Sequence, residues 1–315
     1  MPDRILTSAQ AINEALAIMG ERDKNVILMG QGIDDKGAFY GTTDGLRPIY
    51  GDRLIETPVS ENAMVGVAIG LAISGKRPVI QFHRVEFALL AMEQIINNAA
   101  KMHYISNGQH KCPLVIRMIV GRGWGNGPEH TQSLESMFAY IPGLKVIMPT
   151  FPCDYKGMIC AAIEDNNPVI IIENRWTHYV KGNVPSGYYK QQIDKPLLHK
   201  MGNKCTVVAN GTNLLYAMNM PDADIFDMQV LRPLNWEAII ESVKKTSNLI
   251  IYDTGYVTYG IGAEIIARCV EAGLVFSVKR CGLPQHPVPS SRGYLSAIYP
   301  DSGGDQPNPE FVGPF

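Results

Sequence analysis

The chain has 315 residues, of which 46% are hydrophobic and 18% charged, and its formal net charge is −2. This length predicts two α/β domains rather than one core. A near-neutral charge argues against nucleic acid as a partner. The longest apolar run, residues 64–73, is too short to span a membrane. The first residues show no signal-peptide pattern, and the six cysteines form no Cys-x-x-Cys pair, so we expect a cytoplasmic protein with free thiols.

Apolar periodicity in the first 173 residues predicts helices that alternate with short buried strands. The first helix is expected at 8–22, with Ser8 as its N-cap. Further helices are expected after residue 60 and at 87–104, 133–140 and 154–164, and strands at 25–30, 77–82, 113–120, 144–149 and 168–173. This alternation predicts a parallel sheet covered on both faces.

A second α/β unit is predicted after a polar stretch that is rich in Tyr, Gly and Lys. Its strands are expected at 204–210, 224–231, 248–253 and 274–280, and its helices at 236–245 and 260–272. We therefore predict two three-layer α/β/α domains with mainly parallel sheets. The first covers residues 1–188, a linker covers 189–203, and the second covers 204–315 with a Pro/Gly-rich tail.

The apolar helix in the first domain follows a Pro-constrained turn at residues 56–60. Ser60 is a favoured N-cap, and Glu61 stands at the start of the helix. Because the helix is apolar on every side, we expect it to be buried. Gly66 and Gly70 lie on one of its faces, where another backbone could approach closely. The carboxylate of Glu61 is either a favourable charge at a helix N-terminus or a functional group.

Three side chains that could bind a ligand or take part in catalysis follow the predicted strands. His83 and Phe87 come after the strand at 77–82. His130 ends a loop that has glycine at positions 121, 123, 125 and 127, and it follows the strand at 113–120. Ligands of open α/β sheets bind at the carboxyl ends of the strands. Together with Glu61, these residues predict a site at that edge.

Several familiar motifs are absent from the sequence. There is no phosphate-binding GxxxxGK[ST], no complete GxGxxG and no GxSxG nucleophile elbow. No His or Cys cluster has the spacing of metal ligands. We interpret His103, His110 and His199 as ordinary surface or helix residues.

The sequence resembles the β subunit (E1 component) of thiamine-diphosphate-dependent 2-oxoacid dehydrogenases, within the transketolase-like family that binds the cofactor's pyrimidine. The matching stretches lie in the family's order over roughly residues 5–285. They are 56–61 (ETPVSE), 77–82 (RPVIQF), 93–101 (EQIINNAAK), 130–132 (HTQ), 142–146 (PGLKV), 162–169 (AIEDNNPV) and 231–235 (LRPLN).

The resemblance implies a role for each residue at the predicted site. Glu61 matches the acid that protonates N1′ of the aminopyrimidine and so activates the cofactor, and Phe87 matches the aromatic residue that stacks on this ring. His130 matches the histidine that faces the substrate. A further set matches a monovalent-cation site, for K⁺, in some members, namely Leu114, Ala162, Asp165 and Asn167.

The resemblance also implies a partner chain. The family holds Mg²⁺ and the cofactor's diphosphate with a GDG…N motif, and here Gly51-Asp52 is followed by Arg53. In two-chain members this motif belongs to the α subunit. We therefore expect an α₂β₂ assembly in which the partner holds Mg²⁺ and in which this chain alone is inactive.

Two departures from the family leave the reaction open. His83 and Arg84 replace a Met/Thr-type segment, which suggests a substrate pocket formed by His83, Arg84 and His130 for something other than plain pyruvate. Residues 301–315 do not resemble the amphipathic helix that usually ends the β subunit near an acyltransferase core. A stand-alone transketolase-like enzyme or carboligase is the alternative to a subunit of a dehydrogenase complex, and a non-catalytic partner is a third possibility.

Overall fold

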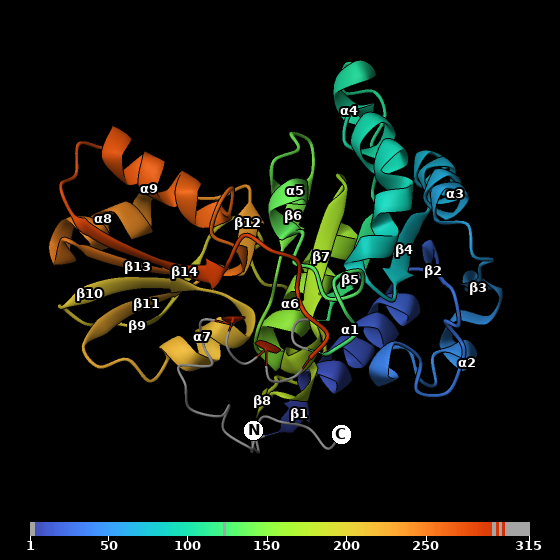
Figure 1. Cartoon of the computed structure of the whole chain (residues 1–315). Coiled ribbons are helices and arrows are strands. Elements are labelled where there is room, and N and C mark those ends of the chain that lie inside the picture. Colours follow the sequence, from blue (N-terminus) through green and yellow to red (C-terminus); the bar gives the residue numbers. More distant parts are fainter. Residues whose placement is uncertain (1–3, 122–123, 292–293, 296–297, 300–315) are drawn as a thin grey trace.

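The computed structural model describes residues 4–121, 124–291, 294–295 and 298–299 and shows two α/β domains side by side (Figure 1). The first domain runs from blue to green in the figure and the second from yellow to red. Both sheets are mainly parallel, so the predicted fold class is confirmed. The predicted tail at 301–315 lies outside the described residues. Across those residues, no helix combines the length and apolar character that crossing a bilayer requires.

The first domain is built on a sheet of order β12-β6-β7-β5-β4-β2-β3 within the described residues. All its pairs are parallel except the one between β12 and β6. The strands are β2 (Val26–Gly30), β3 (Leu54–Glu56), β4 (Arg77–Phe82), β5 (Val115–Val120), β6 (Lys145–Ile147), β7 (Val169–Asn174) and β12 (Val230–Arg232). Every residue of β2, β5 and β7 is buried, as expected for parallel strands with covered faces.

Helices cover both faces of this sheet because successive strand residues point to opposite sides. On one face α1 (Ser8–Arg22) and α6 (Pro152–Glu164) pack on the strands. On the other face lie α3 (Glu61–Ile73), the 3₁₀ helix η3 (Val85–Ala91) and the π-helix η4 (Gln94–Ala99). The shorter elements are η1 (Ala38–Gly41), α2 (Arg47–Tyr50), η2 (Gly51–Arg53), α4 (Met102–Ile105), α5 (Glu135–Ala139), η5 (Arg175–Tyr179) and the antiparallel pair β1 (Ile5–Thr7) and β8 (Lys181–Asn183).

The second domain has a sheet of order β14-β13-β10-β11-β9 among the described residues, antiparallel only between β11 and β9. One face is covered by α7 (Gly211–Ala217) and the other by α8 (Glu237–Thr246) and α9 (Ile261–Glu271). The strands are β9 (Leu197–Lys200), β10 (Cys205–Ala209), β11 (Ala223–Asp227), β13 (Asn248–Tyr256) and β14 (Ser277–Leu283).

The structure interlocks the two domains more than the sequence suggested. The strand predicted at 224–231 is two strands, and the second, β12, crosses over to join the sheet of the first domain. Within the predicted linker 189–203, β9 pairs with β11. The division at residues 188 and 204 therefore stays a proposal, because strand pairs form across the boundaries that were drawn from composition.

The prediction of one long α-helix at 87–104 is wrong. The segment is a 3₁₀ turn, a π-helix and a short α-helix in succession. The side chain of Asn98 donates to the carboxylate of Glu93 at 3.2 Å, five residues earlier, a spacing that suits a π-helix. The N-cap of α1 is also one residue earlier than predicted: Thr7, not Ser8, forms a capping box with Gln10.

Helix α3 is buried on one side only, which corrects the expectation of complete burial. Met64, Val65 and Ala68 are in the core, whereas Val67 is 56% exposed and Ile73 is 42% exposed. Gly66 packs near Gln94, and a Cβ placed on Gly70 would meet no atom of the described chain within 4 Å. Ser60 stands at the N-cap position without a capping hydrogen bond from its side chain. An apolar stripe of α3 thus lies open at the surface.

Candidate active site

The carboxyl ends of neighbouring strands bring the predicted site residues to one edge of the first sheet. Glu61 follows β3, and His83, Arg84 and Phe87 follow β4, which is separated from β3 by β2. His130 follows β5, the next strand on the other side of β4. This edge is where open parallel sheets bind their ligands.

Glu61 begins α3 and is 6% exposed. Among the described residues its carboxylate has no hydrogen-bond or ion-pair partner. The helix N-terminus favours a negative charge at this position, but it does not supply a side-chain partner. Glu61 is therefore free to bond an external group.

Phe87 and His130 are in direct contact. Both are half-buried, and their ring centroids lie 5.6 Å apart at an interplanar angle of 71°, an edge-to-face arrangement. Nδ1 of His130 is buried and lacks a hydrogen-bond partner within the described chain. The loop before it turns through Gly125 and Gly127, whose positive φ angles of 78° and 79° suit glycine. The imidazole thus keeps an unused polar atom beside an aromatic ring.

Glu86 is a site residue that the sequence did not suggest. Its carboxylate is buried, and Oε1 accepts a hydrogen bond from the amide of Gln132, two residues after His130, at 2.6 Å. Burial raises the pKa of Glu86, although nearby His130 and Arg84 act in the opposite direction. Its position gave no signal, because the helix was expected to begin at residue 87, whereas the 3₁₀ helix η3 already includes Glu86.

His83 and Arg84 lie at the same edge but contact different groups. His83 is exposed overall, but its ring centroid lies 4.5 Å from that of Phe39. Partial desolvation, with the charge of Arg84 as the second cause, lowers the pKa of His83. Arg84 stacks on the indole of Trp124 at 4.1 Å and donates to the hydroxyl of Tyr40 at 3.2 Å. Two aromatic residues therefore orient this guanidinium.

Arg175, which the sequence also did not suggest, joins this aromatic cluster from the end of β7. It is 5% exposed and stacks on Tyr40 at 3.7 Å and on Trp124 at 5.4 Å. Nη2 donates to the hydroxyl of Tyr179, whereas Nε and Nη1 have no hydrogen-bond partner in the described chain. Burial lowers the pKa of Arg175. Arg175 forms no ion pair with a carboxylate of the described residues, and a guanidinium with free donors is suited to bind an anion.

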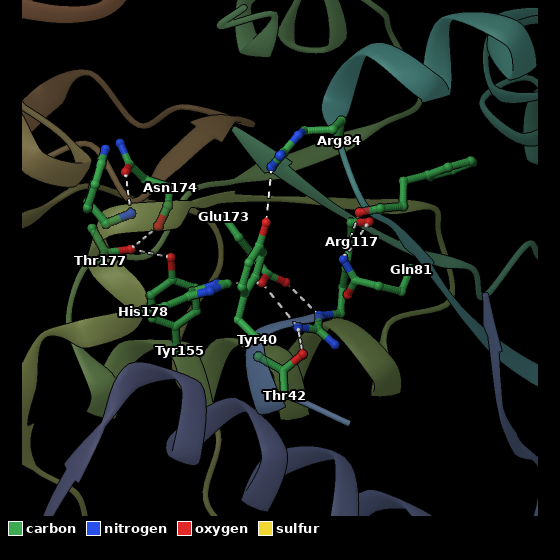
Figure 2. A network of polar contacts seen from close by, with 12 residues as sticks. Tyr40, Thr42, Gln81, Arg84, Arg117, Tyr155, Glu173, Asn174, Thr177 and His178 are labelled. Carbon is green, nitrogen blue, oxygen red and sulfur yellow. Dashed lines mark hydrogen bonds and ion pairs between the residues drawn. The ribbon is translucent and has the colours of Figure 1, made fainter. Parts of the chain in front are cut away.

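A buried ion pair supports the loops that carry this cluster (Figure 2). Arg117 on β5 donates to Glu173 on β7 at 2.6 and 3.1 Å and to Thr42, near Tyr40, at 3.2 Å. His178 lies 2.9 Å from the same carboxylate, and burial lowers the pKa of this imidazole. Burial alone would raise the pKa of Glu173, but Arg117 and His178 hold it below its ordinary value. The pair fixes the loops around Tyr40 and Arg175.

We expect Arg117→Met to reduce the free energy of unfolding by about 3–5 kcal/mol, because it leaves the Glu173 carboxylate buried without its cation. Urea denaturation measures this change. The matched control is Arg268→Met, which removes an exposed pair with Glu264, whose side chain is 53% exposed, and should cost less than about 1 kcal/mol. Similar losses in both variants would contradict the supporting role of Arg117.

The residues of the predicted monovalent-cation site lie together at the opposite ends of the strands. The carbonyl of Leu114 accepts from Val169 at 2.9 Å, and that of Ala162 accepts from Asp165 at 3.3 Å. Asn167 donates to the carboxylate of Asp165 at 2.9 and 3.1 Å. The ammonium group of Lys145 bonds the same carboxylate. Burial alone would raise the pKa of Asp165, but Lys145 and Asn167 lower it.

Comparison with known proteins gives the family. Residues 5–178 match the transketolase pyrimidine-binding domain, and residues 194–302 match the transketolase C-terminal domain. A solved structure described as a split-gene transketolase, an inactive β4 tetramer, superposes with a TM-score of 0.72 at 19% identity, covering 95% of this chain and 96% of that one. At that identity the likeness concerns the fold.

Curated relatives are similar over most of the chain. The β subunit of an acetoin:2,6-dichlorophenolindophenol oxidoreductase from Cupriavidus necator is 34% identical, with 91% of each chain covered. The β subunit of 2-oxoisovalerate dehydrogenase from Pseudomonas aeruginosa is 35% identical, covering 84% and 83%. The mitochondrial pyruvate dehydrogenase E1 β subunit of Bos taurus is 34% identical, covering 84% and 78%. The resemblance seen in the sequence is confirmed: the chain belongs to the transketolase-like family of thiamine-diphosphate-dependent enzymes, in the group of 2-oxoacid dehydrogenase E1 β subunits.

Proposed function

We propose that this chain supplies the pyrimidine half of a thiamine-diphosphate site that acts on a 2-oxo acid or a related ketone, with decarboxylation and acyl or ketol transfer. The observation that supports this most is the contact between Phe87 and His130, at the edge of the sheet where Glu61 begins α3. The named relatives act on acetoin, pyruvate and 2-oxoisovalerate, which are all small ketones or 2-oxo acids.

The side chains at this edge fit an aminopyrimidine. The carboxylate of Glu61 would exchange a proton with N1′, and the ring of Phe87 would stack on the heterocycle. The buried Nδ1 of His130 would face the reacting carbon of the substrate. Thiamine diphosphate itself supplies, when bound, the nucleophilic carbon and the electron sink. This chain's residues bind the pyrimidine, hold the proton and orient the substrate.

An α subunit with a GDG…N motif would complete the site, in an α₂β₂ assembly, by holding Mg²⁺ and the diphosphate. The open stripe of α3 supports such an assembly, because Val67 and Ile73 are apolar and exposed on the helix that Glu61 begins. In the same region Leu90 is 66% exposed. A partner that covers this surface would also enclose Glu61. Attachment to an acyltransferase core remains a separate proposal.

The direct test is co-expression with a GDG-bearing partner chain. The assembled enzyme should reduce 2,6-dichlorophenolindophenol when given a 2-oxo acid or acetoin together with thiamine diphosphate and Mg²⁺. Ketol transfer between sugars in the same assay would instead support the transketolase-like alternative. A purified assembly that shows no turnover and no imino-tautomer absorbance of the bound cofactor would contradict a catalytic role.

We propose that Arg84, Arg175, His83 and His130 form the substrate-facing polar set. Arg84→Gln should raise KM for 2-oxo acids roughly 10–150-fold, because a hydrogen bond to a charged group is worth about 1.5–3 kcal/mol. KM for uncharged hydroxyketones should change little. Initial rates of the assembled enzyme over both substrate classes measure this. His83→Ala should likewise change the preference between the two substrate classes, because His83 belongs to the same set, although its ring also packs on Phe39. Equal losses for both classes would assign Arg84 to structural support.

Two further proposals concern ions and compartment. We propose a monovalent-cation site at Leu114, Ala162, Asp165 and Asn167. The ammonium of Lys145 bonds the Asp165 carboxylate and would compete with a bound cation for it. A melting temperature that is higher in K⁺ than in an equal concentration of choline would support it. The six cysteines are all free, which supports a reducing compartment such as the cytoplasm.

A further inference from the structure

Three side chains of types that can bind metals, two carboxylates and one imidazole, come together where the two domains meet. Asp154 is near the start of α6 in the first domain, His199 is on β9, and Asp227 ends β11 in the second domain. One carboxylate oxygen from each aspartate and one imidazole nitrogen all lie within 4.8 Å of one another. Residues from both domains thus converge on one point.

The two carboxylates in this cluster are buried without the hydrogen bonds that they need. Asp227 is fully buried, and neither of its oxygens has a hydrogen-bond partner in the described chain. Asp154 is 3% exposed; Oδ1 accepts from Gln191 at 2.7 Å, and Oδ2 has no partner there. Buried polar groups almost always have a partner, so these oxygens indicate a missing ligand.

The charges of the cluster point to a cation. Nε2 of His199 lies 3.5 Å from Oδ2 of Asp227, at the outer limit of hydrogen-bond distance, and its ring packs on Phe151 at 5.0 Å. The charged groups that act on Asp227 are His199 and Asp154; no lysine or arginine of the described chain is among them. A single imidazole cannot neutralise two buried carboxylates.

We propose that Asp154, His199 and Asp227 bind a divalent transition-metal ion, Zn²⁺ above all, which joins the two domains. One imidazole nitrogen with two carboxylate oxygens is a ligand set that suits Zn²⁺, whereas Mg²⁺ prefers oxygen ligands alone. Ligands of tetrahedral Zn²⁺ stand about 3.3 Å apart, close to the distance of 3.5 Å between His199 and Asp227. The widest separation, at most 4.8 Å, must shorten by up to about 1.5 Å, which side-chain rotation can supply.

The test needs no partner subunit and no cofactor. The purified full chain is stripped with EDTA and titrated with Zn²⁺ by calorimetry, and its melting temperature is measured with Zn²⁺, with Mg²⁺ and with EDTA. We expect saturable binding of about one Zn²⁺ and a melting temperature several degrees higher with Zn²⁺, because the ion binds the folded state. Mg²⁺ should have little effect.

Variants assign the binding to the cluster. Asp227→Asn and His199→Gln, which keep side-chain size, should each abolish the response to Zn²⁺. Asp224→Asn is the matched control: Asp224 is on the same strand and is also buried, but it is paired with Lys245 and Ser242 at 2.6 Å. It should lose stability and keep its response to Zn²⁺. The proposal would be overturned if the unmodified chain showed no saturable Zn²⁺ binding. It would also be overturned if Asp227→Asn responded to Zn²⁺ like the unmodified chain, because the ion would then bind elsewhere, for example at thiols.

Discussion

Glu61→Gln should lower turnover of the assembled enzyme by at least about 10²–10⁴-fold, the usual contribution of a general acid or base. Glutamine keeps the size of the side chain but cannot hold or release the proton at N1′ of the pyrimidine. Glu61 has the burial and the free carboxylate that this role requires. Steady-state rates of the variant, co-purified with the partner chain, measure the loss.

The stability of the same variant separates chemistry from folding. Removing the charge from the first turn of α3 should cost only about 0.3–1 kcal/mol of helix-dipole energy. Glu237→Gln is the matched control, since Glu237 is the first residue of α8 and is exposed. Both variants should melt close to the unmodified chain, and only Glu61→Gln should lose activity. A Glu61→Gln enzyme with more than about half the normal rate would refute the assignment.

The fold was predictable because buried parallel strands appear in the sequence as nearly continuous apolar runs. The runs at β4, β5 and β7 each gave a strand within two residues of its observed bounds. The sheet to which a short strand belongs was not predictable in this way. β12 has three residues and leaves its own domain to pair with β6, a choice that depends on tertiary packing rather than on local pattern.

The position of the candidate site residues at one edge of the sheet was predictable, whereas their chemical roles stay a proposal. Glu61, Phe87 and His130 follow different strands, and the rule that strand ends gather at one edge placed them together. Arg175 gave no such signal, because a lone arginine after a strand is common, and its role depends on the rings of Tyr40 and Trp124. Contacts between loops that are distant in the sequence leave no recognisable spacing pattern in it.

The cluster of Asp154, His199 and Asp227 at the domain junction could not be predicted from the sequence either. His199 was interpreted as an ordinary surface or helix residue, but it lies on β9 and faces two buried aspartates. Metal-ligand spacing is visible in a sequence only when ligands share a helix or a turn. Here Asp154 and Asp227 are 73 positions apart and belong to different domains.

The isolated chain should bind thiamine diphosphate weakly or not at all, and it should catalyse neither decarboxylation nor ketol transfer. The diphosphate carries several negative charges that require Mg²⁺ and its oxygen ligands. The nearest match to a GDG motif, η2 (Gly51–Arg53), serves the fold instead. The guanidinium of Arg53 donates to the carbonyls of Gly20, Val26 and Ile49 at 3.0, 2.8 and 2.9 Å. This segment therefore holds α1, β2 and α2 together through hydrogen bonds.

Calorimetry with thiamine diphosphate and Mg²⁺ tests this prediction on the purified chain, whose folded state is first checked by circular dichroism. No heat of binding is expected at micromolar cofactor, and co-purification with a GDG-bearing α chain should restore both binding and turnover. A second arm uses Val67→Glu, which places a charge on the open stripe of α3, where Val67 is 56% exposed. This change should leave the chain folded and weaken its co-purification with the partner, because burying an unpaired charge in an interface is costly. Tight, Mg²⁺-dependent binding by the chain alone would show that it holds a whole cofactor site by itself.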